Sequence, residues 1–300
     1  LDWLNGKEVF DLKGQKIVEF YFKENGRLYS KKEVSTLSIK SVLKDIPDTQ
    51  AARKEMEQLW GSQDIFSYPK TLELPKLFSR LATDKDDIIL DFFSGSATTA
   101  HAVMQLNAED GGNRKYIMVQ LPEECEEKSE AYKAGYRNIC EIGKERIRRA
   151  GAKIKEESPL TTQDLDIGFR VFKLDDTNMK DVYCSAEEMT QRNLSGMLSN
   201  IKEDRTDLDL LFGCLLEWGL PLSLPYQLER IEGCTVHTYN DGDLIACFDE
   251  NVPDSVVKII ARRQPLRVVF RDSSFASSPA KINVTEIFKL LAPDTRVKVL

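Results

Sequence analysis

The residues best suited to chemistry in this sequence lie at positions 88–98. An apolar run, Ile-Ile-Leu, ends in Asp91, and the small residues at 94–97 (Ser-Gly-Ser-Ala) precede a helical pattern that begins at Thr98. Such a bend brings backbone N–H groups and a helix N-terminus to one place, and Gly95 has no Cβ to keep a ligand away from the main chain. The Asp91 carboxylate would suit an amine or hydroxyl group of that ligand.

A second acidic position follows the next apolar run. Residues 115–121 (KYIMVQL) lead into Pro122, Glu123 and Glu124. In a doubly wound sheet, an acid at the tip of a neighbouring strand binds ribose hydroxyls. Asp91 and Glu123 would then lie side by side and span a ligand of nucleoside size. The alternative is a tight strand-to-helix turn that binds nothing.

The same bend lacks two common nucleotide-binding patterns. It does not contain the three glycines of the dinucleotide fingerprint, which argues against NAD and FAD. It also lacks the Gly-Lys-Ser/Thr of a P-loop, which argues against hydrolysis of nucleoside triphosphates.

The elements around these positions predict a parallel sheet with crossover helices, because strand, helix and strand alternate. The predicted elements are a helix within 71–84, a strand at 88–92, a helix at 98–107, a strand at 116–121 and a helix at about 129–150. Upstream, short β-like runs at 16–22 and 27–30 precede a helix that begins at Asp48 or Thr49 and ends at Gly61.

After a linker at 156–163, the pattern predicts a small α/β domain. Its predicted elements are a strand at 168–174, a helix at 207–219, a hairpin near 234–248, a helix at 254–263, a strand at 266–271, a helix at 283–291 and a strand at 296–300. No internal repeat is visible.

Composition limits the classes that remain. The 300 residues are 41% hydrophobic, enough for real cores, and the net charge of −7 argues against a nucleic-acid coat protein. The six cysteines lie far apart with no CxxC pair, and only two histidines could join them as ligands, so no metal site is expected. Scattered thiols indicate a reducing cytoplasm, and no apolar run is long enough to span a membrane.

A basic stretch at 144–155 has two interpretations. Its acids alternate with bases, and Ile142, Ile147 and Ala150 form an apolar stripe. We favour an amphipathic helix whose charged side chains, Arg146 among them, lie in solvent; the alternative is a helix that faces DNA.

Residues 91–103 (DFFSGSATTAHAV) resemble the cofactor loop of the amino-group DNA methyltransferases, whose pattern is Asp-Pro-Phe-x-Gly-Ser-Gly-Thr-Thr. The stretch 66–124 is similar to the modification (Mod) subunit of type III restriction–modification systems. The similarity continues in the segments 166–178, 209–225, 244–252 and 265–300. Two departures stand in the loop: Phe92 replaces the proline and Ala97 the last glycine, a methyl group that is tolerable if residue 97 is already helical.

The resemblance implies an α/β fold, with a partial Rossmann-like methyltransferase sheet and a smaller C-terminal α/β domain, and S-adenosylmethionine (SAM) as the cofactor. Asp91 would contact the methionine amino group, with Phe93, Gly95 and Ser96 forming the loop beside it. Thr98 would add a hydroxyl, and Glu123 would bind the ribose hydroxyls. Lys70, in the Pro-Lys element of the family, would lie near the methionine end as a carboxylate partner.

Methyl transfer to a base nitrogen also needs a flipped base, an aromatic platform and acceptors for the amino group. The family supplies these with [Asp/Asn/Ser]-Pro-Pro-[Tyr/Phe], and this sequence contains no Pro-Pro dipeptide. Because the family places that motif upstream of the cofactor loop, we expect residues 1–300 to be the C-terminal part of a longer Mod protein. We expect this part to contain no catalytic residues and to be inactive alone.

The expected organisation has three parts. Residues 1–62 would end a target-recognition or connecting region, 63–157 would be the SAM-binding part, and 158–300 a C-terminal α/β domain. The expected partners are double-stranded DNA, the restriction (Res) subunit and, as a homodimer, a second Mod copy. The expected activity is adenine-N6 methylation; the alternatives are cytosine-N4 methylation, a module at 160–300 that docks Res or Mod, and a nicotinamide-dependent oxidoreductase.

Overall fold

The computed structural model describes residues 7–12, 16–32, 42–43, 46–180, 200–275 and 277–300. The chain forms two compact units, Leu1–Gly168 and Phe169–Leu300. Parts of the predicted region 1–62, and Cys184, lie outside the described residues. Among the described residues, no helix is both long and apolar enough to cross a membrane.

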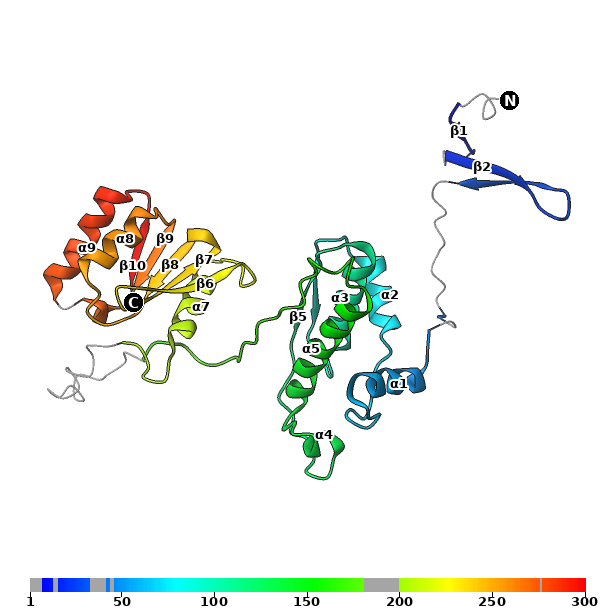
Figure 1. Ribbon diagram of the computed structural model, residues 1–300, viewed down its shortest axis with the longest axis horizontal. Coiled ribbons are helices and arrows are strands. Elements are labelled where there is room, and N and C mark those ends of the chain that lie inside the picture. Colours follow the sequence, from blue (N-terminus) through cyan, green and yellow to red (C-terminus); the bar gives the residue numbers. More distant parts are fainter. Residues whose placement is uncertain (1–6, 13–15, 33–41, 44–45, 181–199, 276) are drawn as a thin grey trace. The chain divides into compact units, whose positions relative to one another are not determined.

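The first unit begins with an antiparallel sheet of β1 (Val9–Phe10), β2 (Lys16–Phe22) and β3 (Leu28–Lys32), which confirms the two predicted β-like runs (Figure 1). Helix α1 (Thr49–Trp60) follows. The Asp48 side chain caps α1 by accepting from two backbone N–H groups, and Gly61 ends it in the left-handed conformation at φ 74°. Both predicted ends of this helix are confirmed.

The centre of the first unit is a parallel crossover. Strand β4 (Ile88–Asp91) pairs in parallel with β5 (Lys115–Met118), and α3 (Thr98–Asp110) connects them. Helices α2 (Glu73–Ala82) and α5 (Ile139–Glu157) pack against α3. Five consecutive residues of α3, Ala100–Met104, are buried, as expected of a helix enclosed by other elements.

The helix predicted at 129–150 is two helices, α4 (Glu130–Lys133) and α5. Between them, Gly135 takes φ 98°, and the Asn138 side chain caps α5 by accepting from the Glu141 N–H. The break therefore comes from local chemistry that the apolar periodicity does not register.

The two strands of this parallel sheet have one covered face. Ile88, Leu90 and Ile117 are 62%, 58% and 50% exposed, whereas the residues that alternate with them are half-buried. Parallel strands are usually covered on both faces. This uncovered face is an unusual property of the first unit.

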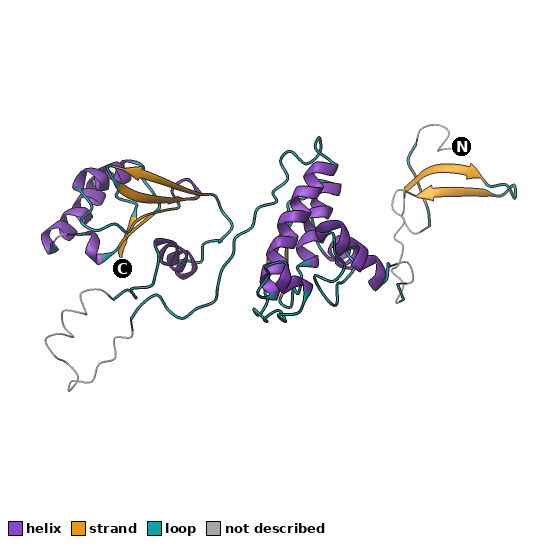
Figure 2. Cartoon of the chain, turned by 60° about the horizontal axis from the view of Figure 1, so that its bottom comes forward, coloured by secondary structure: helices purple, strands orange, loops and turns teal. Residues whose placement is uncertain are grey.

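The second unit is a five-stranded sheet with helices on both faces (Figure 2). The strand order is β10 (Arg296–Val299), β9 (Arg267–Phe270), β8 (Leu244–Cys247), β7 (Cys234–Tyr239) and β6 (Tyr226–Ile231). Strands β8, β9 and β10 are parallel, and β7 and β6 are antiparallel additions. Strands β7 and β8 form the predicted hairpin, since they pair antiparallel and a 3-10 turn at Asn240–Gly242 joins them.

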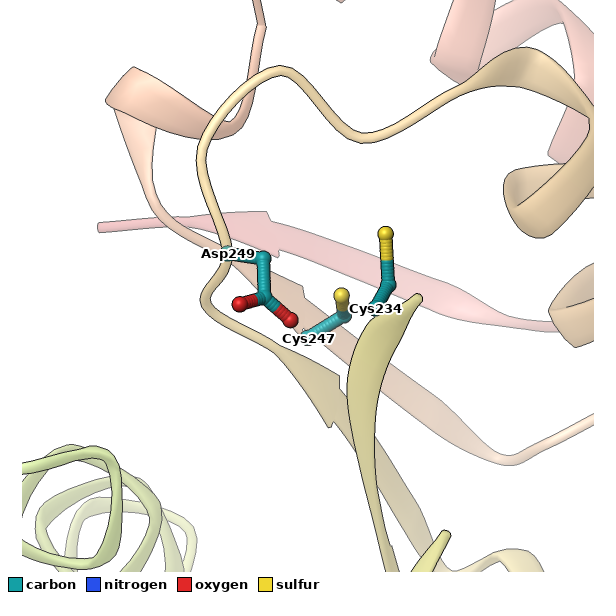
Figure 3. Close-up of side chains that lie close together, drawn as sticks. All are labelled: Cys234, Cys247 and Asp249. Carbon is teal, nitrogen blue, oxygen red and sulfur yellow. The ribbon is translucent and has the colours of Figure 1, made fainter. Parts of the chain in front are cut away.

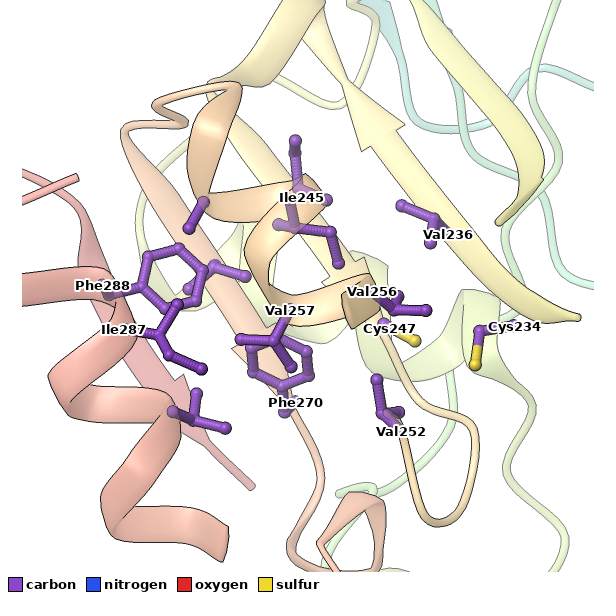
Figure 4. Close-up of a cluster of buried hydrophobic side chains, with 14 of the residues drawn as sticks. Cys234, Val236, Ile245, Cys247, Val252, Val256, Val257, Phe270, Ile287 and Phe288 are labelled. Atoms are coloured by element: carbon purple, nitrogen blue, oxygen red, sulfur yellow. The ribbon is translucent and has the colours of Figure 1, made fainter. Parts of the chain in front are cut away.

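Two apolar clusters hold this sheet. On one face, Ile245 and Phe270 pack with residues of α8 (Asp254–Arg262) and α9 (Ser278–Leu291), as Figure 4 shows. On the other face, Leu244 and Val269 pack with α7 (Asp207–Glu217). Adjacent residues of β8 and β9 thus serve opposite cores, which explains their continuous apolar sequence.

Two details of the second unit differ from the prediction. Residues 168–174 form no strand, because the Arg170 guanidinium ties the segment to the carbonyls of Leu222 and Leu224 by its side chain instead of by a backbone ladder. Strand β6 was not predicted, because the adjacent Glu229 and Arg230 interrupt the alternation of apolar and polar residues after Leu228.

Candidate functional site

A cavity of about 370 Å³ opens where β4 ends. One wall is the bend between β4 and α3, and the other is the segment that leads into α2. The lining residues are Phe66, Tyr68, Lys70, Leu74, Pro75, Phe78, Asp91, Phe93, Ser94, Gly95, Ser96, Thr98 and Thr99. Apolar rings with one acid and one base suit a small ligand that carries both charges.

The cavity brings together six of the seven residues predicted from the sequence: Lys70, Asp91, Phe93, Gly95, Ser96 and Thr98. Glu123 is not among the lining residues. It lies exposed beyond the end of β5, where its carbonyl accepts from the Ile139 N–H at 3.0 Å. The contact of each residue with a cofactor stays a prediction.

Asp91 is fixed by the start of α3. Its Oδ2 accepts from the Thr99 hydroxyl at 2.6 Å, and its Oδ1 accepts from the Phe93 N–H at 3.2 Å. A carboxylate has about four acceptor positions, so these bonds orient Asp91 and still leave capacity for a ligand amine. Thr99 was not among the predicted site residues, although its spacing from Asp91 is visible in the sequence.

Three backbone amides of the bend, those of Ser94, Gly95 and Ala97, are used within the protein. The N–H groups of Ser94 and Ala97 donate to the carbonyls of Val119 and Ser94, and the Gly95 N–H donates to Gln120 Oε1 at 2.8 Å. A ligand would therefore meet mainly side chains and the start of α3, whose N-terminus has no side-chain cap. The sequence pattern had suggested that these amides would face the ligand.

Ala97 is not helical, which corrects the expectation for the substituted loop glycine. It takes φ 59° and ψ 40°, in the left-handed region that costs a residue with a Cβ about 1–2 kcal/mol. Its methyl group is accommodated because α5 leaves room for it: even a Cβ built on Gly143 would lie 3.5 Å from the Ala97 Cβ, an ordinary van der Waals contact. The bend and α5 thus fit closely without strict need for glycine at 97.

Residues 4–133 match the family model of a DNA methylase of the N6/N4 type. The chain is 43% identical over 129 residues to the StyLTI Mod subunit of Salmonella typhimurium, covering 43% of the chain and 19% of that protein. It is 28% identical over 293 residues to the EcoPI Mod subunit of Escherichia phage P1, covering 93% and 44% respectively. It is 30% identical over 241 residues to the EcoP15I Mod subunit of Escherichia coli, covering 77% and 35%.

The chain is thus similar to Mod subunits of type III restriction–modification enzymes, over most of its length in two of the three comparisons. The resemblance inferred from the cofactor loop is thereby confirmed. The chain spans less than half the length of these three relatives. The cavity described above lies within the matched residues 4–133.

Sequence reasoning missed a buried basic residue behind the cavity. Arg146 on α5 was expected in solvent, but it is 0% exposed and its Nη1 donates to Ser96 Oγ at 3.0 Å and Thr98 Oγ1 at 2.7 Å. Burial and this guanidinium lower the pKa of His101 to about 3, so the imidazole is neutral at ordinary pH. His101 is thus a buried, neutral residue of α3.

In the second unit, Cys234, Cys247 and Asp249 have donor atoms within 4.8 Å of one another (Figure 3). Burial raises the pKa of the Cys247 thiol to about 12 and raises that of Cys234 too, so both stay protonated at neutral pH. Both thiols pack in an apolar cluster with Val252 (Figure 4), and Asp249 accepts from the Thr235 N–H. We assign the two thiols to the core.

Proposed function

We propose that this chain supplies the methyl-donor site of a SAM-dependent DNA adenine-N6 methyltransferase of a type III restriction–modification system. The observation that carries the proposal is a cavity that Lys70, Asp91 and Gly95 line together. A carboxylate and an ammonium suit the amino and carboxyl groups of the methionine part of SAM, and the surrounding rings suit its apolar and aromatic parts. Bound there, SAM would supply an electrophilic methyl group.

The roles of individual residues follow from their surroundings. Asp91, held by Thr99, would bind the methionine ammonium, and Lys70 the carboxylate. Phe93, 78% exposed, would cover the ligand once it is bound. Glu123 would bind the ribose hydroxyls from outside the cavity lining. Ser96 and Thr98 line the cavity, but their hydroxyls accept from Arg146, so their role would be to shape the bend.

Calorimetric titration of the chain with SAM tests this function. We expect Asp91→Ala to weaken binding at least about tenfold, because a charge-assisted hydrogen bond is lost, and Glu123→Ala to weaken it by less. Asp86→Ala and Glu127→Ala, at exposed positions away from the cavity, are matched controls. Unchanged affinity in both Asp91→Ala and Glu123→Ala would remove these assignments, and tighter binding of NADH than of SAM would favour an oxidoreductase.

The chain should bind SAM without methylating DNA. Its 300 residues contain no Pro-Pro dipeptide, and therefore no [Asp/Asn/Ser]-Pro-Pro-[Tyr/Phe] element to hold a flipped base. Incubation with labelled SAM and double-stranded DNA should leave the DNA unlabelled. Label on the DNA would show that the chain has catalytic groups of its own, and its position on adenine or cytosine would separate N6 from N4 transfer.

A second proposed role, docking of the Res subunit or another Mod copy, concerns residues 158–300. Ile282 and Leu290 of α9 are 64% and 81% exposed, which is unusual for large aliphatic side chains on a helix whose other face is buried. Ile282→Asp together with Leu290→Asp should abolish co-purification with Res and leave SAM affinity unchanged. Retained co-purification would place docking elsewhere.

A further inference from the structure

The guanidinium of Arg146 fixes one wall of the cavity from behind. Its Nη1 donates to Ser96 Oγ and to Thr98 Oγ1, at 3.0 and 2.7 Å, and both hydroxyls belong to the bend after β4. Arg146 itself is 0% exposed and does not line the cavity. Its contacts therefore fix the shape of the bend without reaching a ligand.

The carboxylate of Glu55, on α1, fixes the opposite wall in the same way. Both of its oxygens accept from the Leu72 N–H, at 3.2 and 3.0 Å, and Oε1 also accepts from the Thr71 hydroxyl at 3.3 Å. Thr71 and Leu72 directly follow Lys70 and lead into α2. Glu55, too, is outside the cavity lining.

The two groups meet behind the cavity. Arg146 Nη2 lies 3.8 Å from Glu55 Oε2, an ion pair longer than a hydrogen bond. Among the described residues, Arg146 Nε and Nη2 have no hydrogen-bond partner. Burial lowers the pKa of Arg146 to about 10 and raises that of Glu55, so both charged forms are disfavoured here. A buried pair of this kind is a poor source of stability compared with apolar packing, which points to a different role.

We propose that Arg146 and Glu55 are positioning residues that together hold the two walls of the cavity, at 94–98 and at 70–72, in the arrangement that binds SAM. The inference rests on the proposed function for the identity of the ligand. It deepens that function, because it makes the affinity of the cavity depend on two residues that never touch the ligand.

Calorimetric titration of the full chain with SAM tests the role of Arg146. We expect Arg146→Met to weaken binding about tenfold or more. Arg146→Lys should weaken it less, because lysine keeps one charged donor nitrogen for the two hydroxyls and loses only the second nitrogen, which faces Glu55. Arg148→Met is the matched control: Arg148 lies on the same helix, is exposed and pairs with Glu145. An affinity of Arg146→Met within twofold of that of Arg148→Met would overturn the proposal.

Thr98 variants separate positioning from direct contact. Thr98→Val removes the hydroxyl that Arg146 binds, whereas Thr98→Ser keeps it and should restore affinity. Combined with Arg146→Met, Thr98→Val should add little further loss, because the two residues act through one bond. Additive losses would mean that Thr98 contacts the ligand independently, which would overturn this route of action.

Hydrogen exchange without any ligand gives an independent readout. Arg146→Met and Glu55→Gln should each speed amide exchange at both 71–73 and 94–99, and Arg148→Met at neither. If the unmodified chain fails to bind SAM, the proposed function fails, and this experiment alone decides the positioning role. Faster exchange confined to the wall that the changed residue contacts would overturn the link between the walls.

Discussion

The parallel strands of the two units differ in how their faces are covered. Strands β8 and β9 of the second unit are almost entirely buried between α7 on one side and α8 and α9 on the other. Strands β4 and β5 of the first unit leave Ile88, Leu90 and Ile117 exposed. Similar apolar strands thus serve as a closed core in one unit and as an uncovered surface in the other, and strand composition alone does not distinguish the two.

The interiors differ in polarity as well. Apolar side chains and thiols make up the core cluster beneath α8 and α9. The interior of the first unit contains Arg146, His101 and the half-buried Glu55, and the cavity lies beside them. Buried polar groups without full hydrogen bonding lower stability unless function requires them, so this contrast supports the site proposed in the first unit.

The largest effect should come from the closed core. Phe270→Ala, at a ring that is 0% exposed in β9, should cost about 3–5 kcal/mol of unfolding free energy, whereas Leu90→Ala on the uncovered face should change it by less than about 0.5 kcal/mol. Denaturant titration of both variants measures the difference. Comparable losses would mean that the face of β4 and β5 is covered in solution.

A smaller loss should follow from filling space between α5 and the chain after it. The Cβ of Gly151→Ala would lie 2.9 Å from the Ile167 Cβ, so the variant should be destabilised by about 1–3 kcal/mol. Gly143→Ala on the same helix is the control, because its Cβ would have only ordinary contacts, at 3.4 Å or more. Equal melting temperatures for the two variants would contradict this packing.

Ala97→Gly should stabilise the first unit by up to about 1 kcal/mol, because the left-handed conformation costs alanine more than glycine. The gain is limited by the greater freedom of glycine in the unfolded chain. Thermal unfolding measures it. A lower melting temperature would mean that the Ala97 methyl group contributes more through its packing against α5 than it costs in backbone strain.

The smallest effects should depend on pH, with opposite sign in the two units. The His237 imidazole, with Nε2 3.5 Å from Asp207 Oδ2, lowers the pKa of Asp207, so Asp207 stabilises the second unit above about pH 4 and this contribution is lost as pH falls. Burial raises the pKa of Glu55, so its contribution to the first unit is present at low pH and is lost as pH rises through the raised value.

Unfolding free energies of two variants across pH check these signs. The disadvantage of Asp207→Asn relative to the unmodified chain should vanish as pH falls below about 4, since both side chains are then neutral. Relative to the unmodified chain, Glu55→Gln should gain stability as pH rises. Parallel pH profiles for the two variants would contradict the contrast between the units.

Local chemistry made part of this structure predictable. Asp48 and Gly61 mark the ends of α1 because caps act over a few residues, and the crossover from Asp91 to β5 follows from apolar runs separated by a bend. The burial of Arg146 could not be predicted from the sequence. A basic residue among alternating charges gives the same pattern whether its side chain faces solvent or binds the Thr98 hydroxyl, 48 residues earlier in the chain. The Gln120 bond to Gly95 likewise joins residues whose proximity only the fold creates.

That bond between Gln120 and Gly95 makes ligand entry an exchange reaction. A ligand oxygen that reaches the Gly95 N–H must displace the Gln120 amide, which trades one hydrogen bond for another and yields little heat. The favourable heat of association would then come from the charged ends of the ligand at Asp91 and Lys70. Removing the competitor, as in Gln120→Ala, would leave the amide without its partner and make its capture by a ligand more exothermic.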